Sequence, residues 1–515
     1  MKLLHETYLG KVKVIYIDPP YNTGSDLIYD DDFSQETEEY LDNSGQIDDD
    51  GNRLVVNLES NGRFHTDWLN MIYPRLKFAK DLLSDDGVLL VSINEYEDGN
   101  LRKICDEIFG YHNRVCCFDW QTKKAAQGMA TANMVVTNNE HVYVYAKNRM
   151  AFRFRGLDRN EANGFSNPDD DPRGLWKRQY LQRLGQGLPT RTIVDPSNGN
   201  VFSFETPYTQ EKLERWIKEG RIIFPLETNK YPARKEFLSE YENKQQLVTE
   251  LGLFATKATT EKLYDLFDGT KIFTNPKPDS LLVFLIKQSS DEESIIVDFF
   301  SGSATTAHAV MQLNAEDGGK RKFILVQFPE TCSNDSDAYK AGYKTICEIG
   351  EERIRRAGKK IKKEHPAANI DIGFRLFKVD SSNMQDVYYT PGDYNQEQID
   401  LFASNIKGDR TPEDLLFQVM LDLGVPLSSS IEEEEIIGKK VFLVGKEYTD
   451  SEGIVCTHLI ACFDDNINDD TVKAIAEKHP AYAVFRDSGM TNDSVATNFE
   501  QIFETYSPKT VRKVL

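Results

Sequence analysis

The chain has 515 residues, of which 40% are apolar and 28% charged, and its formal net charge is -22. This length suffices for two to four domains with sizeable cores, and no apolar run approaches the roughly 18 residues that a membrane-spanning helix needs. The seven cysteines include the adjacent pair Cys116 and Cys117 but no CxxC spacing, which argues against a disulfide framework and against a structural zinc site. We therefore expect a cytoplasmic protein that binds no metal.

The first 148 residues alternate helices with apolar strands. The strand VKVIYI ends at Asp18, and a helix that begins near Phe64 leads through an SDDG turn to the strand Val88–Ile93. A short helix, LRKICDEIFGY, and another strand, EHVYVYAKN, follow. Such alternation is typical of βαβ units, so we predict an α/β fold around a mostly parallel sheet.

The first strand runs into the motif Asp18-Pro19-Pro20-Tyr21. The prolines have a fixed φ and no N–H, and Pro19 favours an extended backbone at Asp18. The strand tip thus presents a carboxylate, a free carbonyl oxygen and a flat ring in preset directions. These groups suit a planar ring with an exocyclic amine, held by Asp18 and the Pro19 carbonyl and stacked on Tyr21. The alternative is a simple surface turn with an exposed tyrosine.

In residues 149–265 the alternation stops and turn-forming residues cluster, so we predict an inserted domain there. Basic residues in this part lie among aromatic ones, although the chain as a whole is acidic. A duplex responds to the local surface on which it docks, so the net charge leaves a nucleic-acid partner open. The alternative is a solvated basic face over an aromatic core. The basic residues that would contact DNA are Arg153, Arg155, Arg173, Lys177 and Arg178.

A second motif, IIVDFFSGSATTAHAV, occupies residues 295–310. It predicts an apolar strand that ends at Asp298, a turn of small residues and a helix N-terminus with unpaired N–H groups. The motif lacks the lysine of a phosphate-binding P-loop, which favours a nucleoside or amino-acid ligand. The next strand, FILVQFPE, ends near Glu330, an acid that could accept hydrogen bonds from a ribose. A plain strand–turn–helix junction is the alternative.

The last part of the chain, from residue 381, contains three further apolar strands with helices between them: KKVFLV, HLIACF and AYAVFR. We find no catalytic constellation in this part, which favours an interaction role.

The two motifs together resemble the S-adenosylmethionine-dependent amino-methyltransferases of DNA, in the motif order of their β class. The longer run IYIDPPYNTGSD with DDF, and the segments TNPKPDSLL, GFRLFKVDSSN and LIACFDDNI, resemble the modification (Mod) subunits of type III restriction–modification systems. The resemblance implies a Rossmann-like methyltransferase core in two halves (1–148 and 266–380), an inserted target-recognition domain (149–265) and a C-terminal α/β interaction domain (381–515).

The resemblance also implies roles for single residues. Asp18 and the Pro19 carbonyl would hold the N6 amine of adenine, with Pro20 completing the motif, and Tyr21 would stack on the flipped base. Lys277 matches the lysine of the family's KP motif, which lies against the methionine part of the cofactor. The residues implied for binding S-adenosylmethionine are Lys277, Pro278, Asp298, Phe300, Ser301, Gly302, Ser303, Thr305 and Glu330.

The function implied is site-specific methylation of adenine N6 in double-stranded DNA, in the cytoplasm of a bacterium or archaeon. The expected partners are a second copy of the chain and a restriction (Res) subunit. Two alternatives stay open. One is methylation of cytosine N4, although enzymes of that kind usually have Ser at the first position of the motif. The other is a catalytically silent recognition subunit, because the family's upstream Gly-Asp-Asn strand end does not occur in this sequence.

Overall fold

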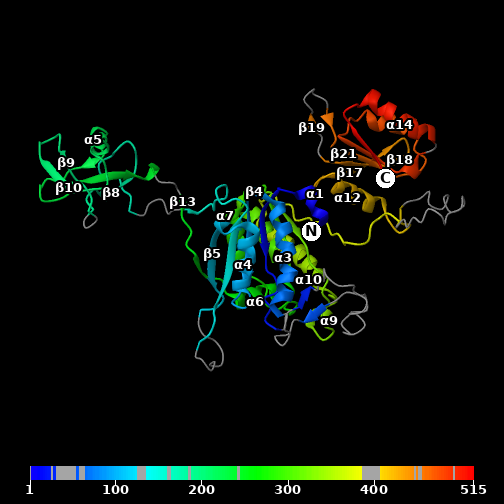
Figure 1. The fold of residues 1–515 in the computed structure, drawn as a ribbon, viewed down its shortest axis with the longest axis horizontal. Coiled ribbons are helices and arrows are strands. Elements are labelled where there is room, and N and C mark those ends of the chain that lie inside the picture. The colour runs from blue at the N-terminus through cyan, green and yellow to red at the C-terminus, as the bar shows by residue number, and fades with distance from the viewer. Residues whose placement is uncertain are drawn as a thin grey trace. The chain divides into compact units, whose positions relative to one another are not determined.

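The structure, a computed structural model, describes most of the chain (Figure 1). The described residues are 2–24, 27–29, 54–56, 64–124, 135–158, 164–183, 187–240, 244–385, 406–445, 448–449, 455–490 and 493–515. The chain divides into two compact units, which are described separately below. One unit comprises Met1–Phe152, Gly252–Ile286 and Ser290–Leu515, and the other comprises Arg153–Leu251 and Lys287–Ser289.

A seven-stranded sheet with the order β14-β5-β6-β4-β1-β15-β16 forms the centre of the larger unit. Its strands are β1 (Val12–Ile17), β4 (Leu83–Ile93), β5 (Arg114–Gln121), β6 (Asn139–Ala146), β14 (Glu250–Leu253), β15 (Ile295–Asp298) and β16 (Lys322–Leu325). The pairs β1–β4, β1–β15 and β15–β16 are parallel, whereas β6 runs antiparallel to both β4 and β5. The predicted α/β fold with a mostly parallel sheet is therefore confirmed.

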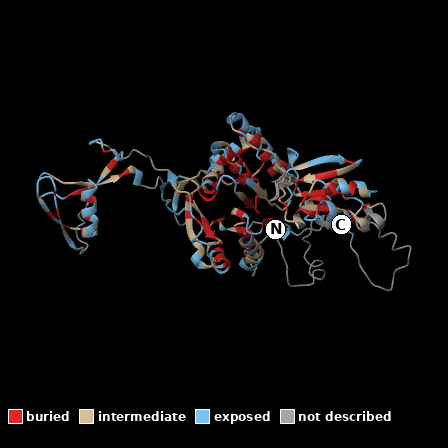
Figure 2. Cartoon of the chain, turned by 90° about the horizontal axis from the view of Figure 1, so that it is seen from above, coloured by how far each residue is buried: buried red, intermediate tan, exposed pale blue. Residues whose placement is uncertain are grey.

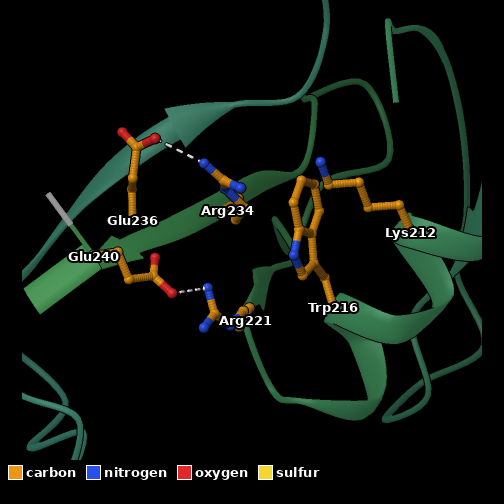
Figure 3. Close-up of a pocket in the computed structure, with 6 residues that line it drawn as sticks. All are labelled: Lys212, Trp216, Arg221, Arg234, Glu236 and Glu240. Carbon is orange, nitrogen blue, oxygen red and sulfur yellow. Dashed lines mark hydrogen bonds and ion pairs between the residues drawn. The ribbon is translucent and has the colours of Figure 1, made fainter. Parts of the chain in front are cut away.

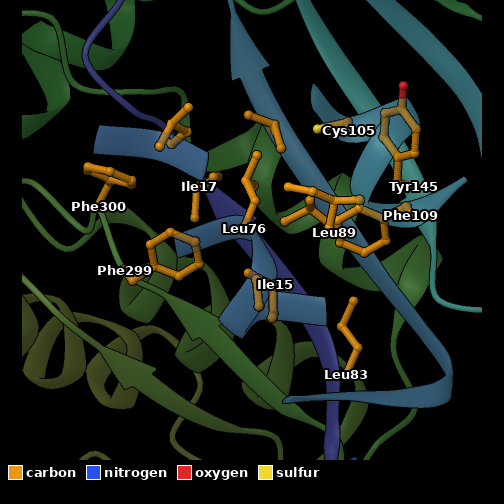
Figure 4. Close-up of a cluster of buried hydrophobic side chains, with 14 of the residues drawn as sticks. Ile15, Ile17, Leu76, Leu83, Leu89, Cys105, Phe109, Tyr145, Phe299 and Phe300 are labelled. Carbon is orange, nitrogen blue, oxygen red and sulfur yellow. The ribbon is translucent and has the colours of Figure 1, made fainter. Parts of the chain in front are cut away.

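The central strands are buried, which explains their continuous apolar sequences. Buried residues gather in the interior of this part of the chain (Figure 2). One face of the sheet packs on helices α3 and α4, and the core between them includes Ile15, Ile17 and Leu89 (Figure 4). Apolar residues of α8 and α10 form a second core with Phe323 and Leu325. The helices of this region are α1 (His5–Tyr8), α3 (Phe64–Leu82), α4 (Asp98–Phe109), α6 (Thr256–Leu266), α7 (Asp279–Ser289), α8 (Thr305–Asp317), α9 (Asp337–Lys340) and α10 (Ile346–Glu364). The segments β2 (Leu27–Tyr29) and β3 (Leu54–Val56) form a two-stranded pair.

The described residues of the smaller unit form an insert of short strands and the α-helix α5, with its own apolar core. Its boundaries differ from the predicted 149–265, because the chain rejoins the central sheet earlier than its turn-forming residues indicate. The strand β14 lies beside β5, and the Phe254 amide donates to the Gln121 carbonyl at 2.9 Å. The elements of the insert are β7 (Leu157–Asp158), β8 (Trp176–Tyr180), β9 (Thr190–Val194), β10 (Val201–Glu205), α5 (Gln210–Lys218), β11 (Ile222–Ile223), β12 (Ala233–Phe237) and β13 (Lys244–Gln245).

The C-terminal part has a separate five-stranded sheet, and its three predicted strands are confirmed as β18, β21 and β22. It nevertheless belongs to the larger compact unit, because the Leu427 amide donates to the Tyr8 hydroxyl at 2.9 Å and the Thr7 hydroxyl donates to the Leu421 carbonyl at 3.2 Å. Its elements are α12 (Pro412–Asp422), β17 (Ile431–Ile436), β18 (Lys439–Val444), β19 (Tyr448–Thr449), β20 (Val455–Cys456), β21 (Leu459–Cys462), α13 (Asp469–Ala476), β22 (Tyr482–Phe485), α14 (Asp493–Tyr506) and β23 (Val511–Val514). Throughout the described part of the chain, every helix is too short or too polar to cross a membrane.

Candidate active site

The two sequence motifs meet at one edge of the central sheet. Strands β1 and β15 are parallel neighbours, with Val14 opposite Ile296 and Ile15 opposite Val297. Because parallel strands end at the same edge of a sheet, Asp18, which follows β1, lies at a strand tip adjacent to that of Asp298, the last residue of β15. Burial is the main cause that raises the pKa of Asp298, and the negative charge of Asp18 adds to it, as expected for nearby carboxylates. Two stretches almost 280 residues apart therefore form one site.

Asp18 lies in a cluster of four polar groups at the tip of β1. The Lys277 ammonium is 3.2 Å from Oδ1 of Asp18 and 3.0 Å from Oε2 of Glu140. The Tyr21 hydroxyl donates to the same Glu140 oxygen at 2.9 Å. The ammonium also lies 4.5 Å from the centre of the Tyr21 ring, a distance at which a cation is attracted to the aromatic face. One cation thus bridges two carboxylates above an aromatic ring.

Glu140 is a member of this cluster that sequence reasoning missed. It is the second residue of β6, which runs antiparallel to β4 with His141 opposite Ile93. The start of β6 consequently lies at the edge where β4 and β1 end. The acid at the head of EHVYVYAKN was visible in the sequence, but the antiparallel direction of that strand was not.

Burial dominates the electrostatics of the cluster. Desolvation raises the pKa of Asp18, an effect that Lys277 opposes and Glu140 reinforces. The two carboxylates outweigh the effect of burial on Lys277 and raise its pKa, so the ammonium stays charged. Burial and the neighbouring acids hold the pKa of Tyr21 well above its usual value, which keeps the phenol a neutral donor. This arrangement attracts a cation or an N–H donor to Asp18.

The chain that follows the strand tip is fixed by buried hydrogen bonds. The Trp68 indole donates to the Pro20 carbonyl at 2.7 Å. Asn22 adopts a left-handed backbone with φ of 58° and donates to the Phe64 carbonyl and, at 2.5 Å, to the fully buried carboxylate of Glu97. Left-handed backbone is uncommon outside glycine, and Asn is one of the residues that tolerate it. Helix α3 and the start of α4 therefore hold the motif in place.

The second motif forms the predicted strand, turn and helix. Both oxygens of Asp298 accept hydrogen bonds within the motif, from the Phe300 amide at 3.0 Å and from the Thr306 hydroxyl at 2.5 Å. Burial raises the pKa of Asp298 to about 7. The Phe300 ring packs in the core beside Phe299 (Figure 4). Asp298 and Phe300 thus shape the turn from within.

Arg353 of α10 is a second residue that sequence reasoning missed, and it contacts the turn that follows Asp298. Its buried guanidinium donates to the hydroxyls of Ser303 and Thr305, each at 2.7 Å. Burial lowers the pKa of Arg353 to about 10. One helical turn earlier, Gly350 also faces the turn, because a Cβ at this position would lie 3.4 Å from the Gly302 carbonyl oxygen. The turn is consequently preset by a residue fifty positions downstream.

Glu330 reaches the same edge of the sheet through Gln327. The Gly302 amide donates to the Gln327 side-chain oxygen at 2.7 Å, and the Gln327 nitrogen donates to Oε1 of Glu330 at 3.4 Å. Gly302 has a φ of 48°, a left-handed conformation that favours glycine. Pro278 is the residue before α7 and follows Lys277, which places the start of that helix at the cluster. All nine residues implied for the cofactor therefore lie around one strand edge or directly support it.

The five basic residues implied for DNA contact differ in their surroundings. Arg173 bonds the Asp171 carboxylate at 2.8–2.9 Å and stacks on the Phe237 ring, so it holds the insert together. Lys177 lies 3.7 Å from Glu236. Arg178 and Arg153 are exposed, and Arg155 is half-buried.

The insert also contains a pocket of about 350 Å³ that is lined by basic and acidic side chains around Trp216 (Figure 3). The Arg234 guanidinium lies 4.3 Å from the centre of the Trp216 ring and bonds Glu236 at 2.7 Å. The Lys212 ammonium lies 5.2 Å from the same ring, and Arg221 pairs with Glu240. Each arginine of the pocket has an acidic partner, so Lys212 leaves one positive charge in excess among the lining residues.

Comparison with known proteins identifies relatives over most of the chain. The model of the DNA methylase family N6_N4_Mtase matches residues 12–359. The StyLTI Mod subunit of a type III restriction–modification enzyme, from Salmonella typhimurium strain LT2, is 35% identical over 75% of this chain and 59% of its own length. The EcoPI Mod subunit of Escherichia phage P1 is 32% identical over 73% of this chain and 63% of its own. The EcoP15I Mod subunit of Escherichia coli is 31% identical over 74% and 63% respectively. The chain thus spans about three fifths of the length of these relatives.

Proposed function

Because the chain belongs to the DNA methylase family, we propose that it transfers the methyl group of S-adenosylmethionine to N6 of a flipped adenine in DNA. The observation that carries this proposal is the pairing of β1 with β15, which brings Asp18-Pro19-Pro20-Tyr21 beside the turn after Asp298. Positioning and electrostatics can supply most of the catalysis in such a transfer, because the methyl donor is already activated by its sulfonium charge.

Asp18 is the residue to which we assign the target amine. In the described part of the chain, its Oδ1 atom is shielded from solvent and accepts no hydrogen bond of standard geometry, although the Lys277 ammonium pairs with it. A buried acceptor in this condition is suited to an incoming N–H donor. The ammonium also lies over the Tyr21 ring, where a stacked base would lie, so Lys277 must give way when the base enters.

The residues around the turn fit S-adenosylmethionine by the chemistry of their polar groups. The carboxylates of Asp18 and Glu140 would attract the positive sulfonium, and Gln327 and Glu330 offer acceptors for ribose hydroxyls. When the N–CH3 bond forms and the S–CH3 bond breaks, the amine must lose one proton. The Asp18 carboxylate is a suitable acceptor for that proton, because burial raises the pKa of Asp18.

We further propose that the chain acts in the cytoplasm as the modification and recognition subunit of a type III restriction–modification system. The similarity to three Mod subunits supports this assignment. Double-stranded DNA, a second copy of the chain and a Res helicase–nuclease subunit would then be its partners. The insert would recognise the target through phosphate and base contacts.

Replacement of Asp18 by Ala tests the assigned chemistry. Methyl transfer to DNA should be lost while calorimetry still detects S-adenosylmethionine binding, because Asp18 acts on the amine. Asp85→Ala, an exposed acid before the buried part of β4, is the matched control and should keep full activity. Wild-type activity in the Asp18 variant would refute the proposal. Mass analysis of nucleosides from the methylated DNA separates adenine N6 from cytosine N4, and absence of binding heat in the wild type would favour a catalytically silent subunit.

A further inference from the structure

Three side chains of different chemistry converge on one face of strands β5 and β6. They are the Cys117 thiol, the Asp119 carboxylate and the His141 imidazole. One donor atom from each lies within 4.8 Å of the other two. The imidazole Nδ1 and the carboxylate are already 2.6 Å apart. No role in the proposed methyl transfer uses these residues.

The strand register explains why they meet. Successive side chains of a strand point to opposite faces, so Cys117 and Asp119 share a face two residues apart. In the antiparallel pair, Asp119 is directly opposite His141 and Cys117 is directly opposite Tyr143. Cys116 precedes Cys117 by one residue and therefore points to the other face. The three donors are consequently placed by regular strand geometry.

Their chemistry matches a transition-metal cation. A thiolate, an imidazole and a carboxylate bind Zn²⁺ at about 2.3, 2.0–2.1 and 2.0–2.2 Å, with tetrahedral geometry. Donor atoms within 4.8 Å of one another need only small side-chain movements to enclose such an ion. A cross-strand His–Asp pair accounts for two of the three residues. Cys117 also packs against the apolar core, but its thiol donates only a long hydrogen bond, of 4.0 Å, to the Phe118 carbonyl, so the sulfur can turn to a metal ion at little cost.

The surroundings of Cys117, Asp119 and His141 would let an ion enter from solvent and would orient the side chains that bind it. The Asp119 side chain is 50% exposed, which leaves an entry path from solvent and a coordination position for water. The Tyr143 hydroxyl lies within hydrogen-bonding reach of both Asp98 and Cys117, and outer contacts of this kind orient metal ligands. Asp98 adds a second negative charge near the thiol.

We propose that Cys117, Asp119 and His141 bind one divalent cation of the zinc class, with a water molecule as fourth ligand. Binding replaces the thiol proton, which passes to water. The ion joins β5 to β6 next to Glu140, so it stiffens the strand end that holds Tyr21 and Lys277. The cysteine spacing argues against a structural zinc site, but spacing along the sequence does not detect ligands that paired strands contribute.

The test uses the full chain without an affinity tag, stripped with a chelator and titrated with Co²⁺ and Zn²⁺. We expect one equivalent of Co²⁺ to bind with a thiolate-to-cobalt absorption band, and Zn²⁺ to displace it. Cys117→Ser should abolish the band, and His141→Gln should weaken binding at least tenfold. Cys116→Ser is the matched control, because the neighbouring thiol faces away, and it should leave both signals unchanged.

Two results would overturn the proposal. One is a Co²⁺ spectrum without a thiolate band in the wild type, and the other is equal loss of the band in the Cys116 and Cys117 variants. Folding of each variant is checked by circular dichroism, and the His141 variant provides a second measurement if Cys117→Ser unfolds. None of these readouts needs methyl transfer, so their failure is separable from failure of the proposed function.

Discussion

Replacing Glu140 with Gln tests the electrostatic design of the active site. Glutamine retains an oxygen for the Tyr21 hydroxyl but removes the charge that holds the Lys277 ammonium at 3.0 Å. Hydrogen bonds to charged groups contribute about 1.5–3 kcal/mol, and the Glu140 side chain is only 20% exposed, so screening by solvent is limited. At about 1.4 kcal/mol per tenfold change, we expect kcat/KM for DNA to fall about 10- to 150-fold.

The pH dependence of the variant gives a sharper result. Glu140 raises the pKa of Asp18, and Lys277 lowers it. Removing the Glu140 charge frees Lys277 to pair with Asp18 alone, so both changes lower the pKa of Asp18. The acid limb of the kcat/KM profile should therefore move to lower pH, even though the maximum rate falls. A steady-state assay of methyl transfer from labelled S-adenosylmethionine between pH 5 and 9 measures both effects.

Glu107→Gln is the matched control for this experiment. Glu107 also accepts a hydrogen bond from a tyrosine hydroxyl, that of Tyr73, at 2.9 Å, but on the exposed surface of α3 and α4. Its replacement should leave rate and pH profile unchanged. The reasoning is refuted if Glu140→Gln keeps the wild-type rate, or if its acid limb moves to higher pH.

Three further substitutions test the supports of the site and the insert. Asp298→Asn should flatten the pH dependence of urea unfolding. In the wild type, the pKa of Asp298 in the folded state is about 7 and lies above the ordinary value of 3.8. The contribution of this carboxyl group to the free energy of unfolding is therefore fully present below about pH 4, and a few kcal/mol are lost as the pH rises through 7. An equal pH slope in the variant contradicts this. Arg353→Met should lower the free energy of unfolding by about 2–4 kcal/mol and weaken S-adenosylmethionine binding in calorimetry. Replacement of the exposed Arg355 by Met is the control and should lower it by less than about 0.5 kcal/mol. Equal losses of stability in the two variants would contradict a supporting role for Arg353. Arg178→Ala should reduce the slope of log K for DNA against log salt by about 1 in anisotropy titrations, and Arg173→Ala should instead lower the melting temperature; an unchanged slope argues against Arg178.

The strand tips of the core were predictable because apolar runs, prolines and small residues signal them locally. Val12–Ile17 and Ile295–Asp298 lie where their sequences place them, and parallel pairing follows from helix–strand alternation. The partners of the motifs were not predictable, because they depend on tertiary pairing. Glu140 arrives through an antiparallel strand, and Arg353 arrives from the buried face of the helix α10.

In the insert, too, some features could be predicted from the local sequence and others depend on tertiary structure. Its existence followed from the loss of helix–strand alternation, but its end was misplaced because β14 is a short edge strand that contains a glycine. Basic residues in a sequence also do not reveal which of them are paired. Arg173 is bonded to Asp171, whereas Arg178 is exposed, and only the fold distinguishes them.

The adjacency of β1 and β15 has a consequence for synthesis on the ribosome. Strand β1 is made early, and its other neighbour β4 follows within about 70 residues, but β15 appears only after about 280. At about 5–20 residues per second, one side of β1 stays without its partner strand for roughly 15 to 60 seconds. An uncovered strand edge is a template for pairing with other chains, so nascent molecules should depend on chaperones during this interval. Ribosomes that stall within the insert would therefore release chains prone to aggregate.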